Sequence, residues 1–441
     1  MRRHWWALAV LGALVWSAPA DAHTQVGHLR AVRHMELAGP YVVYANANGS
    51  RVLAARPGAR PIELFKTKRS SEDCHPSADF AASSRVLAVT VSEFCYRGTP
   101  SWVGNVRTYA GPLLGPYRAI DSCSVRHAER APPQIAASGR RIAFQPVTRR
   151  CKAEPRIVVR DALADRPGVR SFALDRSQPL AWDSIGLAGR YLAYQDRVVD
   201  TRTRRVVYRT GGLTVDDLAP SGRAAVTRYT YKHGLCHTER LGIAGLESLG
   251  PTWLTGPARC DATPHFAAIG SGGVAYSRRS GAERPAHQAI LLDDLRGRRR
   301  TVASFRVVSV SQAFDGRRLA YTQARCDRSH AIWLDDVTRD APYTDRTSLA
   351  CRARAASRPA RVYRDGHAIV WIVCRSGCYV EGQPFPPGSR PRRLTYQTYG
   401  SELYDRVQRE GTVRERLYLR GVDRALRART MRITVTFEKH G

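Results

Sequence analysis

The chain has 441 residues, of which 43% are hydrophobic and 24% charged, and its formal net charge is +32. This apolar content excludes disorder over most of the chain, and the length allows either two or three domains or one large repeat fold. Arginine carries nearly all of the positive charge, because lysine stands only at positions 66, 68, 152, 232 and 439. Two interpretations of the charge stay open: codon bias in a GC-rich genome, or attraction to a polyanion.

The first 22 residues have the layout of a secretory signal peptide. Basic residues at positions 2–4 precede an apolar run over 5–15, and small residues over 17–22 ("SAPADA") offer cleavage sites after Ala20 or Ala22. The apolar run is shorter than the roughly 20 residues that span a bilayer. We therefore expect cleavage, export and a mature chain without a transmembrane segment; an uncleaved membrane anchor is the alternative.

A turn followed by an apolar strand recurs along the chain. The best copies are "RRIAF" at Arg140–Phe144 and "RRLAY" at Arg317–Tyr321, each after a turn that ends in glycine. Glycine suits such a turn because it adopts positive φ without a Cβ clash. Eight copies begin at Leu37, Ala81, Ala136, Gly186, Ala219, Ile269, Ala313 and Tyr363.

Each copy is followed by further strands, and helical periodicity is almost absent. An antiparallel four-stranded unit that recurs every ~40–50 residues is typical of a β-propeller blade. The sequence therefore predicts an all-β fold, a β-propeller of eight blades over residues 23–400. Seven blades are the alternative, if a weak unit around Ala81 or Gly189 is an insertion.

The repeat resembles those of the TolB-like and WD40-like (PD40) β-propeller families, whose turn and strand follow a comparable "DG-basic-basic-apolar-Ala-Tyr/Phe" pattern. The match covers Ala31 to Tyr396, and together with the signal-like segment and the codon bias it identifies the chain as a secreted bacterial member of actinobacterial type. It departs from the pattern because Asp-Gly survives only at Asp315 and Asp365, and the usual Trp-Ser-Pro is missing. The resemblance implies the fold and says little about function.

Residues 401–441 are predicted to be a basic C-terminal extension. Its last segment, Met431–Phe437 ("MRITVTF"), strictly alternates apolar and polar residues, which predicts a half-buried strand. We expect this strand to dock on the propeller or to close it.

The ten cysteines predict disulfides, because their number is even in a chain that begins like an exported protein. No CxxC pair occurs, so structural zinc is not expected. If each cysteine is bonded to its neighbour along the chain, no disulfide has to cross the ring. The predicted bonds are 74–95, 123–151, 236–260, 326–351 and 374–378, with Cys351 bonded to Cys374 or Cys378 as the alternative.

Motifs that carry chemistry are scarce. The sequence holds no G-x-S-x-G, no H-E-x-x-H and no phosphate-binding loop. The three Asp-Asp pairs, at 216/217, 293/294 and 335/336, are interpreted as turn formers. Five histidines lie near the cysteine-bearing loops, and a metal or ligand site among them is an alternative that the sequence does not exclude: His75, His127, His233, His237 and His330. No residue is assigned to a catalytic, cofactor-binding or metal site, and no cofactor is expected.

These observations predict a secreted, disulfide-stabilised propeller that acts as a binding or scaffold protein. We expect the ligand to bind at the face of the propeller that carries the loops, or in the funnel at its centre, where loops from several blades converge. An acidic envelope polymer or a protein is the expected partner, whereas nucleic acid is not expected for an exported monomer. The alternative is a lyase or hydrolase whose active-site residues come from several blades.

Overall fold

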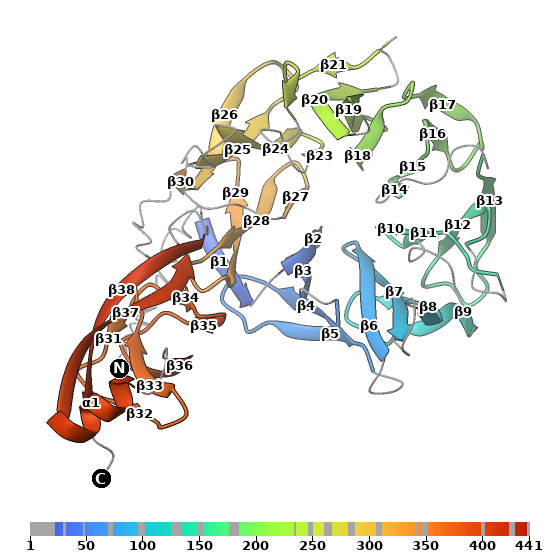
Figure 1. Cartoon of the computed structure of the whole chain (residues 1–441). Coiled ribbons are helices and arrows are strands. Elements are labelled where there is room, and N and C mark those ends of the chain that lie inside the picture. Colours follow the sequence, from blue (N-terminus) through green and yellow to red (C-terminus); the bar gives the residue numbers. More distant parts are fainter. Residues whose placement is uncertain are drawn as a thin grey trace, which may run out of the picture.

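The structure is a computed structural model that describes residues 23–29, 32–46, 49–68, 74–95, 102–124, 134–148, 153–175, 185–232, 235–245, 250–259, 267–280, 287–305, 311–339, 343–344, 351–397, 402–422 and 428–438. These residues form seven small antiparallel sheets arranged in a ring and one larger sheet beside it (Figure 1). The molecule is therefore an all-β propeller with an attached C-terminal sheet.

Each blade has four main strands that run from the centre of the ring outward. The innermost strands are β2 (Val32–Ala38), β6 (Cys74–Ala82), β10 (Ile135–Ser138), β14 (Ile185–Ala188), β18 (Thr214–Leu218), β23 (Ala267–Gly270) and β27 (Gln312–Phe314). The second strands are β3 (Tyr41–Asn46), β7 (Val86–Cys95), β11 (Arg141–Phe144), β15 (Tyr191–Tyr194), β19 (Ala224–Lys232), β24 (Gly273–Ser280) and β28 (Arg318–Ala324).

The third strands are β4 (Arg51–Ala55), β8 (Trp102–Pro112), β12 (Arg156–Asp161), β16 (Arg197–Asp200), β20 (Leu235–Ala244), β25 (His287–Asp293) and β29 (His330–Asp336). The outer strands are β5 (Ile62–Lys66), β9 (Arg118–Ser124), β13 (Val169–Ala173), β17 (Val206–Arg209), β21 (Thr252–Trp253), β26 (Arg299–Phe305) and, on the seventh blade, β1 (His23–Leu29). Two short strands add to outer edges: β22 (Ala258–Arg259) pairs with β20, and β30 (Tyr343–Thr344) pairs with β26.

The ring is closed by the strand nearest the N-terminus. β1 pairs antiparallel with β29, with His23 opposite Asp335 and Leu29 opposite His330. The backbone N–H of Val32, where β2 begins, donates to Nδ1 of His330 at 3.0 Å. The first and last blades are thereby joined, and the seventh blade obtains its outer strand from the opposite end of the propeller sequence.

The prediction of eight blades is wrong, and seven are present. The eighth copy of the repeat, at Tyr363, forms the turn between β32 (Ala360–Val362) and β33 (His367–Val373), which belong to the C-terminal sheet. The turn-and-strand pattern encodes a hairpin, and a hairpin can join any sheet that buries its apolar face. The pattern alone therefore overcounts the blades by one.

The basic residue that follows the turn glycine has a defined partner in several blades. Arg140 pairs with Asp161 at 3.1 Å and Arg317 pairs with Asp336 at 3.0 Å, in both cases joining the turn to the end of the third strand. Gly316, in the turn before Arg317, has φ +99°, which favours glycine. The repeat thus combines a glycine turn with an arginine–aspartate pair across the blade.

The C-terminal sheet lies beside the seventh blade (Figure 1). Besides β32 and β33 it contains β31 (Arg354–Ala355), β34 (Cys378–Val380), β35 (Gln383–Phe385), β36 (Arg392–Gln397), β37 (Thr412–Val422) and β38 (Ala428–Glu438), with helix α1 (Glu402–Glu410) against it. The expected boundary at residue 400 falls inside this sheet, because strands on both sides of it share the same ladders. β38 pairs with β37 and β32, whereas the ring is closed by β1.

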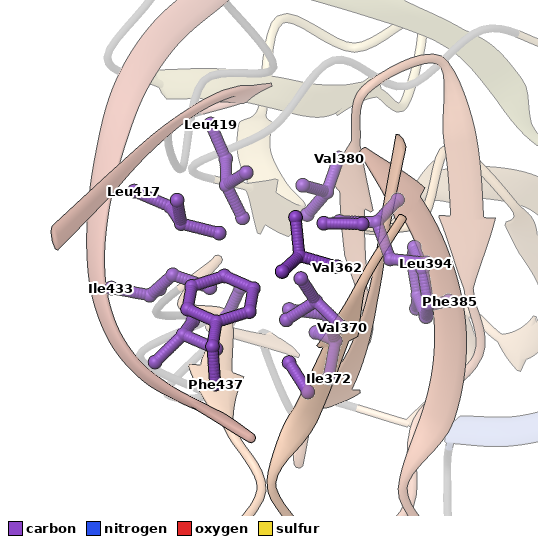
Figure 2. Packing of buried hydrophobic residues seen from close by; sticks show 14 of the residues in the cluster. Val362, Val370, Ile372, Val380, Phe385, Leu394, Leu417, Leu419, Ile433 and Phe437 are labelled. Atoms are coloured by element: carbon purple, nitrogen blue, oxygen red, sulfur yellow. The ribbon is translucent and has the colours of Figure 1, made fainter. Parts of the chain in front are cut away.

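The core of this sheet confirms the strand predicted at Met431–Phe437. Ile433, Val435 and Phe437 are buried, and the residues between them are exposed. Figure 2 shows the apolar side chains of the β37–β38 hairpin directed toward those of the sheet; the labelled residues are Val362, Val370, Ile372, Val380, Phe385, Leu394, Leu417, Leu419, Ile433 and Phe437. The hairpin is therefore fixed by its inner face and leaves its outer face to solvent.

Two of the predicted disulfides are confirmed. Cys326 is bonded to Cys351, and Cys374 is bonded to Cys378. Cys74 and Cys123 are also disulfide-bonded, and Cys74 lies opposite Cys95 in the β6–β7 register. The side chains at positions 95, 151, 236 and 260 lie outside the described residues, so the three remaining pairings stay predictions.

The first disulfide lies where the propeller meets the C-terminal sheet. The Cys326–Cys351 bond packs against Tyr379 of β34, and the guanidinium of Arg328 lies 4.0 Å from the centre of the same ring. No helix in the described part of the chain is long and apolar enough to cross a membrane. The predicted signal peptide, residues 1–22, lies outside the described residues.

Candidate functional site at the centre of the ring

The innermost strands reverse the charge balance of the chain. Within the strand bounds given above, these seven strands carry four carboxylates, Glu36, Asp79, Asp216 and Asp217, but a single arginine, Arg33. The whole chain, in contrast, has 70 lysines and arginines against 38 acidic residues. Each innermost strand contacts the next, and β27 contacts β2, so the seven innermost strands form a closed wall around the centre of the ring. We call this the central wall, and these charged residues belong to it.

Asp216 and Asp217 come from an irregularity in β18. The β18–β19 register shifts between Val215 and Asp217, which leaves Asp216 as an extra residue. A β-bulge of this kind redirects side chains next to functional sites. Here it brings two consecutive carboxylates to the innermost strand of the fifth blade.

Each of these carboxylates is anchored by hydrogen bonds. Oδ2 of Asp216 accepts from the Thr227 hydroxyl at 2.5 Å. Oδ2 of Asp217 accepts from the backbone N–H of Ile269 on the next blade at 2.8 Å, and its Oδ1 accepts from the N–H of Leu218. The pair is therefore held in place by its own blade and by the neighbouring one.

The surroundings raise the pKa of both carboxyls to about 7. Desolvation is the largest cause for each; the Thr227 hydroxyl opposes it at Asp216, and the Ile269 N–H opposes it at Asp217. The charge of Glu239 raises the pKa of Asp216 further. Asp216 is nevertheless exposed to solvent and Asp217 is half-buried, so both are reachable from the centre and water screens part of the desolvation that raises their pKa.

Residues on β2 complete the central wall. Glu36 and His34 lie near enough to Asp217 for their charges to affect its pKa, although the first and fifth blades lie apart on the ring. His34 and Glu36 form a contact of 3.0 Å, and Arg33 pairs with Asp79 at 3.0 Å. The centre is therefore an acidic region with one internal ion pair and a histidine.

This arrangement has two chemical capacities. Carboxyls that titrate near pH 7 can donate or accept a proton at physiological pH, as general acids and bases do. The same carboxylates attract a cation, and a bound cation would lower their pKa. Among the described residues, no group of three or more histidine, cysteine, aspartate or glutamate side chains could hold a metal ion.

The interpretation of the aspartate pairs as turn formers holds for Asp293, Asp294 and Asp336, whereas Asp335 is buried in its strand and accepts a hydrogen bond from the Tyr321 hydroxyl at 3.0 Å. Asp293, Asp294 and Asp336 accept backbone N–H groups within the turns that follow their strands. Asp216 and Asp217 instead lie within an innermost strand. A signal for this was present in the sequence, because this pair precedes the turn glycine Gly222, whereas the other two pairs end a third strand.

The histidines near the cysteine-bearing loops do not form a common site in the described structure. His330 accepts a hydrogen bond from the Val32 backbone and thereby supports ring closure. The side chains of His75, His127, His233 and His237 lie outside the described residues, so their role stays a prediction.

Comparison with known proteins yields only remote structural likenesses. No family model matches the chain, so the TolB-like assignment stays a prediction, and no curated protein matches it. The chain is similar to the propeller domain of the Trilobed protease from Pyrococcus furiosus, with 11% identity and a TM-score of 0.43 over 69% of this chain and 95% of that one.

Two further solved structures show a comparable likeness. A catalytically inactive virginiamycin B lyase from Staphylococcus aureus, solved with quinupristin, is 10% identical with a TM-score of 0.40, over 71% of this chain and 96% of that one. The acylaminoacyl peptidase of Pyrococcus horikoshii is 10% identical with a TM-score of 0.41, over 79% of this chain and 57% of that one.

Proposed function

We propose that this protein is an exported binding protein whose ring centre takes a cationic ligand, one that carries amine or guanidinium groups. The observation that supports this most is the Asp216–Asp217 pair, which faces Glu36 across the centre of a chain that is otherwise strongly basic. An acidic centre inside a basic protein selects cations and repels the anions that the exterior attracts.

Protonation of the site would be linked to binding. A cation close to Asp216 and Asp217 favours their ionised forms and lowers both pKa values, which are about 7 in the free protein. Binding therefore releases protons near neutral pH. It weakens as the pH falls below 7, because the cation must then displace bound protons.

Calorimetric titration with spermidine tests this proposal. We expect saturable binding to the wild type, with proton release that shows as a dependence of the heat on buffer ionisation. Asp216→Asn together with Asp217→Asn should abolish it. The matched control, Asp165→Asn with Asp294→Asn, removes the same charge from the exposed exterior and should leave binding intact. Equal binding by the two double variants, or none by the wild type, would overturn the proposal.

A lyase or hydrolase is the second candidate, because the same two carboxyls titrate where a general acid or base works best. In that case the ligand would be converted rather than only held. Mass spectrometry of a bound compound, before and after incubation with wild type and Asp217→Asn, separates the two functions. A product formed by the wild type alone favours the enzyme.

Export is part of the proposal. It is supported by the signal-like segment at residues 1–22 and by the bonded cysteines, since disulfides persist in oxidising compartments. Expression of the full chain in a bacterial host should deliver a processed protein outside the cytoplasm, beginning at Asp21 or His23. An unprocessed cytoplasmic product would contradict it.

A further inference from the structure

The outer face of the β37–β38 hairpin carries a regular row of cationic side chains. Arg414, Arg416, Tyr418 and Arg420 occupy alternate positions of β37, and all four are exposed. Successive members lie about 7 Å apart, because a strand rises about 3.4 Å per residue. The register places Arg432 of β38 opposite Tyr418.

These arginines lack the aspartate partners that Arg140, Arg190 and Arg317 have in the blades. Within the described part of the chain, no carboxylate or other side chain pairs with the guanidinium groups of Arg414, Arg416 or Arg420. The nearby carboxylates are engaged or peripheral: Glu381 accepts from the backbone N–H of Arg420, and Glu438 lies at the far end of the face, opposite Thr412. The row is therefore an uncompensated positive surface.

Neutral residues on the same face suit a polyhydroxylated ligand. Thr430, Thr434 and Thr436 stand opposite the three arginines, and their hydroxyls are exposed. Tyr418 is 53% exposed, and the guanidinium of Arg432 lies 5.6 Å from the centre of its ring. An exposed aromatic ring offers a stacking surface, and hydroxyls offer both donors and acceptors.

The hairpin presents this face rigidly. Its inner side chains are packed into the core of the C-terminal sheet, and Phe437 and Leu419 are fully buried (Figure 2). Gly421 allows Met431 to lie against the backbone, where a Cβ would collide with its methyl group. A rigid array loses little conformational freedom when it binds, which favours affinity.

We propose that the outer face of the β37–β38 hairpin binds an extended acidic polysaccharide, with carboxylates on the arginine row and sugar rings against Tyr418. Charge complementarity argues for a polyanion, and the threonines and the tyrosine argue for a carbohydrate. Stable attachment to a lipid surface combines basic residues with an apolar group that enters the membrane, whereas the apolar residues of this hairpin are buried inside the protein. This site uses different residues from the ring centre and does not depend on the function proposed there.

Binding of the full chain to polygalacturonate tests this inference. Arg414→Gln, Arg416→Gln and Arg420→Gln together should weaken binding about 10-fold to 100-fold and flatten its salt dependence. The matched control is Arg140→Gln, Arg190→Gln and Arg317→Gln, which removes the same charge from the ring. It should change the affinity less than about twofold, because those arginines are already paired.

Further measurements identify the chemistry of the ligand. Fully methyl-esterified polygalacturonate, which lacks the charge, should not bind, and Tyr418→Ala should weaken binding to the acid form several-fold. Replacement of the three arginines by lysine keeps the charge and should give intermediate affinity, because lysine cannot bind a carboxylate through two parallel hydrogen bonds. Melting temperatures check that every variant is folded.

Several outcomes would overturn the inference. Equal losses in the two triple variants would mean that binding follows net charge alone. Tighter binding to polyphosphate, single-stranded DNA or phosphatidylglycerol vesicles than to polygalacturonate would assign the face to another partner. Spermidine binding at the ring centre is measured on the same variants and should be unchanged, so failure of one proposal is distinguishable from failure of the other.

Discussion

Arginine has different surroundings in the ring and in the C-terminal hairpin. In the blades it follows a turn glycine and pairs with an aspartate at the end of the third strand, as Arg140 does with Asp161. On the hairpin it alternates with buried apolar residues, and Arg416 faces solvent opposite a threonine. The same residue type therefore stabilises a repeat unit in one region and builds an open cationic face in the other.

The difference teaches that net charge is a poor guide to partners. A charge of +32 predicts attraction to polyanions for the chain as a whole. The structure distributes this charge unevenly: the turn arginines Arg140 and Arg317 are paired with aspartates, the centre of the ring is acidic, and the hairpin carries a regular row of arginines.

Truncation of the hairpin anchor should have the largest effect. Phe437→Ala removes a fully buried ring, which typically costs about 3–5 kcal/mol. Hydrogen exchange should show that β37 and β38 open, with loss of polygalacturonate binding but with spermidine binding retained. Thr436→Ala, on the outer face, is the control and should change stability by less than about 0.5 kcal/mol. Simultaneous unfolding of the blades would contradict the independence of the two regions.

Removal of the disulfide at the junction should come next. Cys326→Ser with Cys351→Ser opens a bond between residues 25 apart, and its loss should cost about 2–4 kcal/mol in chemical denaturation. The Cys374–Cys378 bond spans only 4 residues, so its removal should cost about 1.5 kcal/mol less. A reversed order of the two costs would show that strain or unfolded-state structure outweighs loop entropy.

The acidic centre should make stability depend on pH. Asp216 and Asp217 have pKa values raised from 3.8 to about 7 in the folded protein, so their contribution is fully present below pH 4 and is lost as the pH rises through 7. Solvent contact screens the effect, which we place on the order of 1–2 kcal/mol. Denaturation of Asp216→Asn with Asp217→Asn should show a flatter profile between pH 4 and pH 7, and an unchanged profile would exclude these residues as its source.

The smallest effect compares single arginines in the two regions. Arg140→Gln breaks a partly exposed ion pair and should cost about 0.2–1 kcal/mol. Arg416→Gln breaks no pair in the described structure and should leave the free energy of unfolding unchanged. The comparison is made by urea denaturation at low and high salt, where only the first difference should shrink. Equal costs would mean that the pairing seen in the blades does not matter for stability.

Part of the candidate site could be predicted from the sequence, and part could not. The Asp216–Asp217 pair is visible as a motif, but turn formation was the better local explanation, since aspartate is common in turns. The pair lies in a bulge of β18 and not in a turn, and this bulge results from the way β18 pairs with β19. The proximity of Glu36, some 180 residues away along the chain, follows from ring closure, which no local pattern encodes.

The local units follow from the amino-acid order alone: glycine turns, apolar strands, the alternating strand at Met431–Phe437 and two confirmed disulfides. These depend on φ preferences and on the two-residue period of a strand, which act over a few residues. Only the tertiary structure decided that there are seven blades, that β1 closes the ring and that the last repeat joins another sheet. Those outcomes depend on which strand edge each strand pairs with. All strand edges offer the same backbone N–H and C=O groups, so the choice is made only when the whole chain folds.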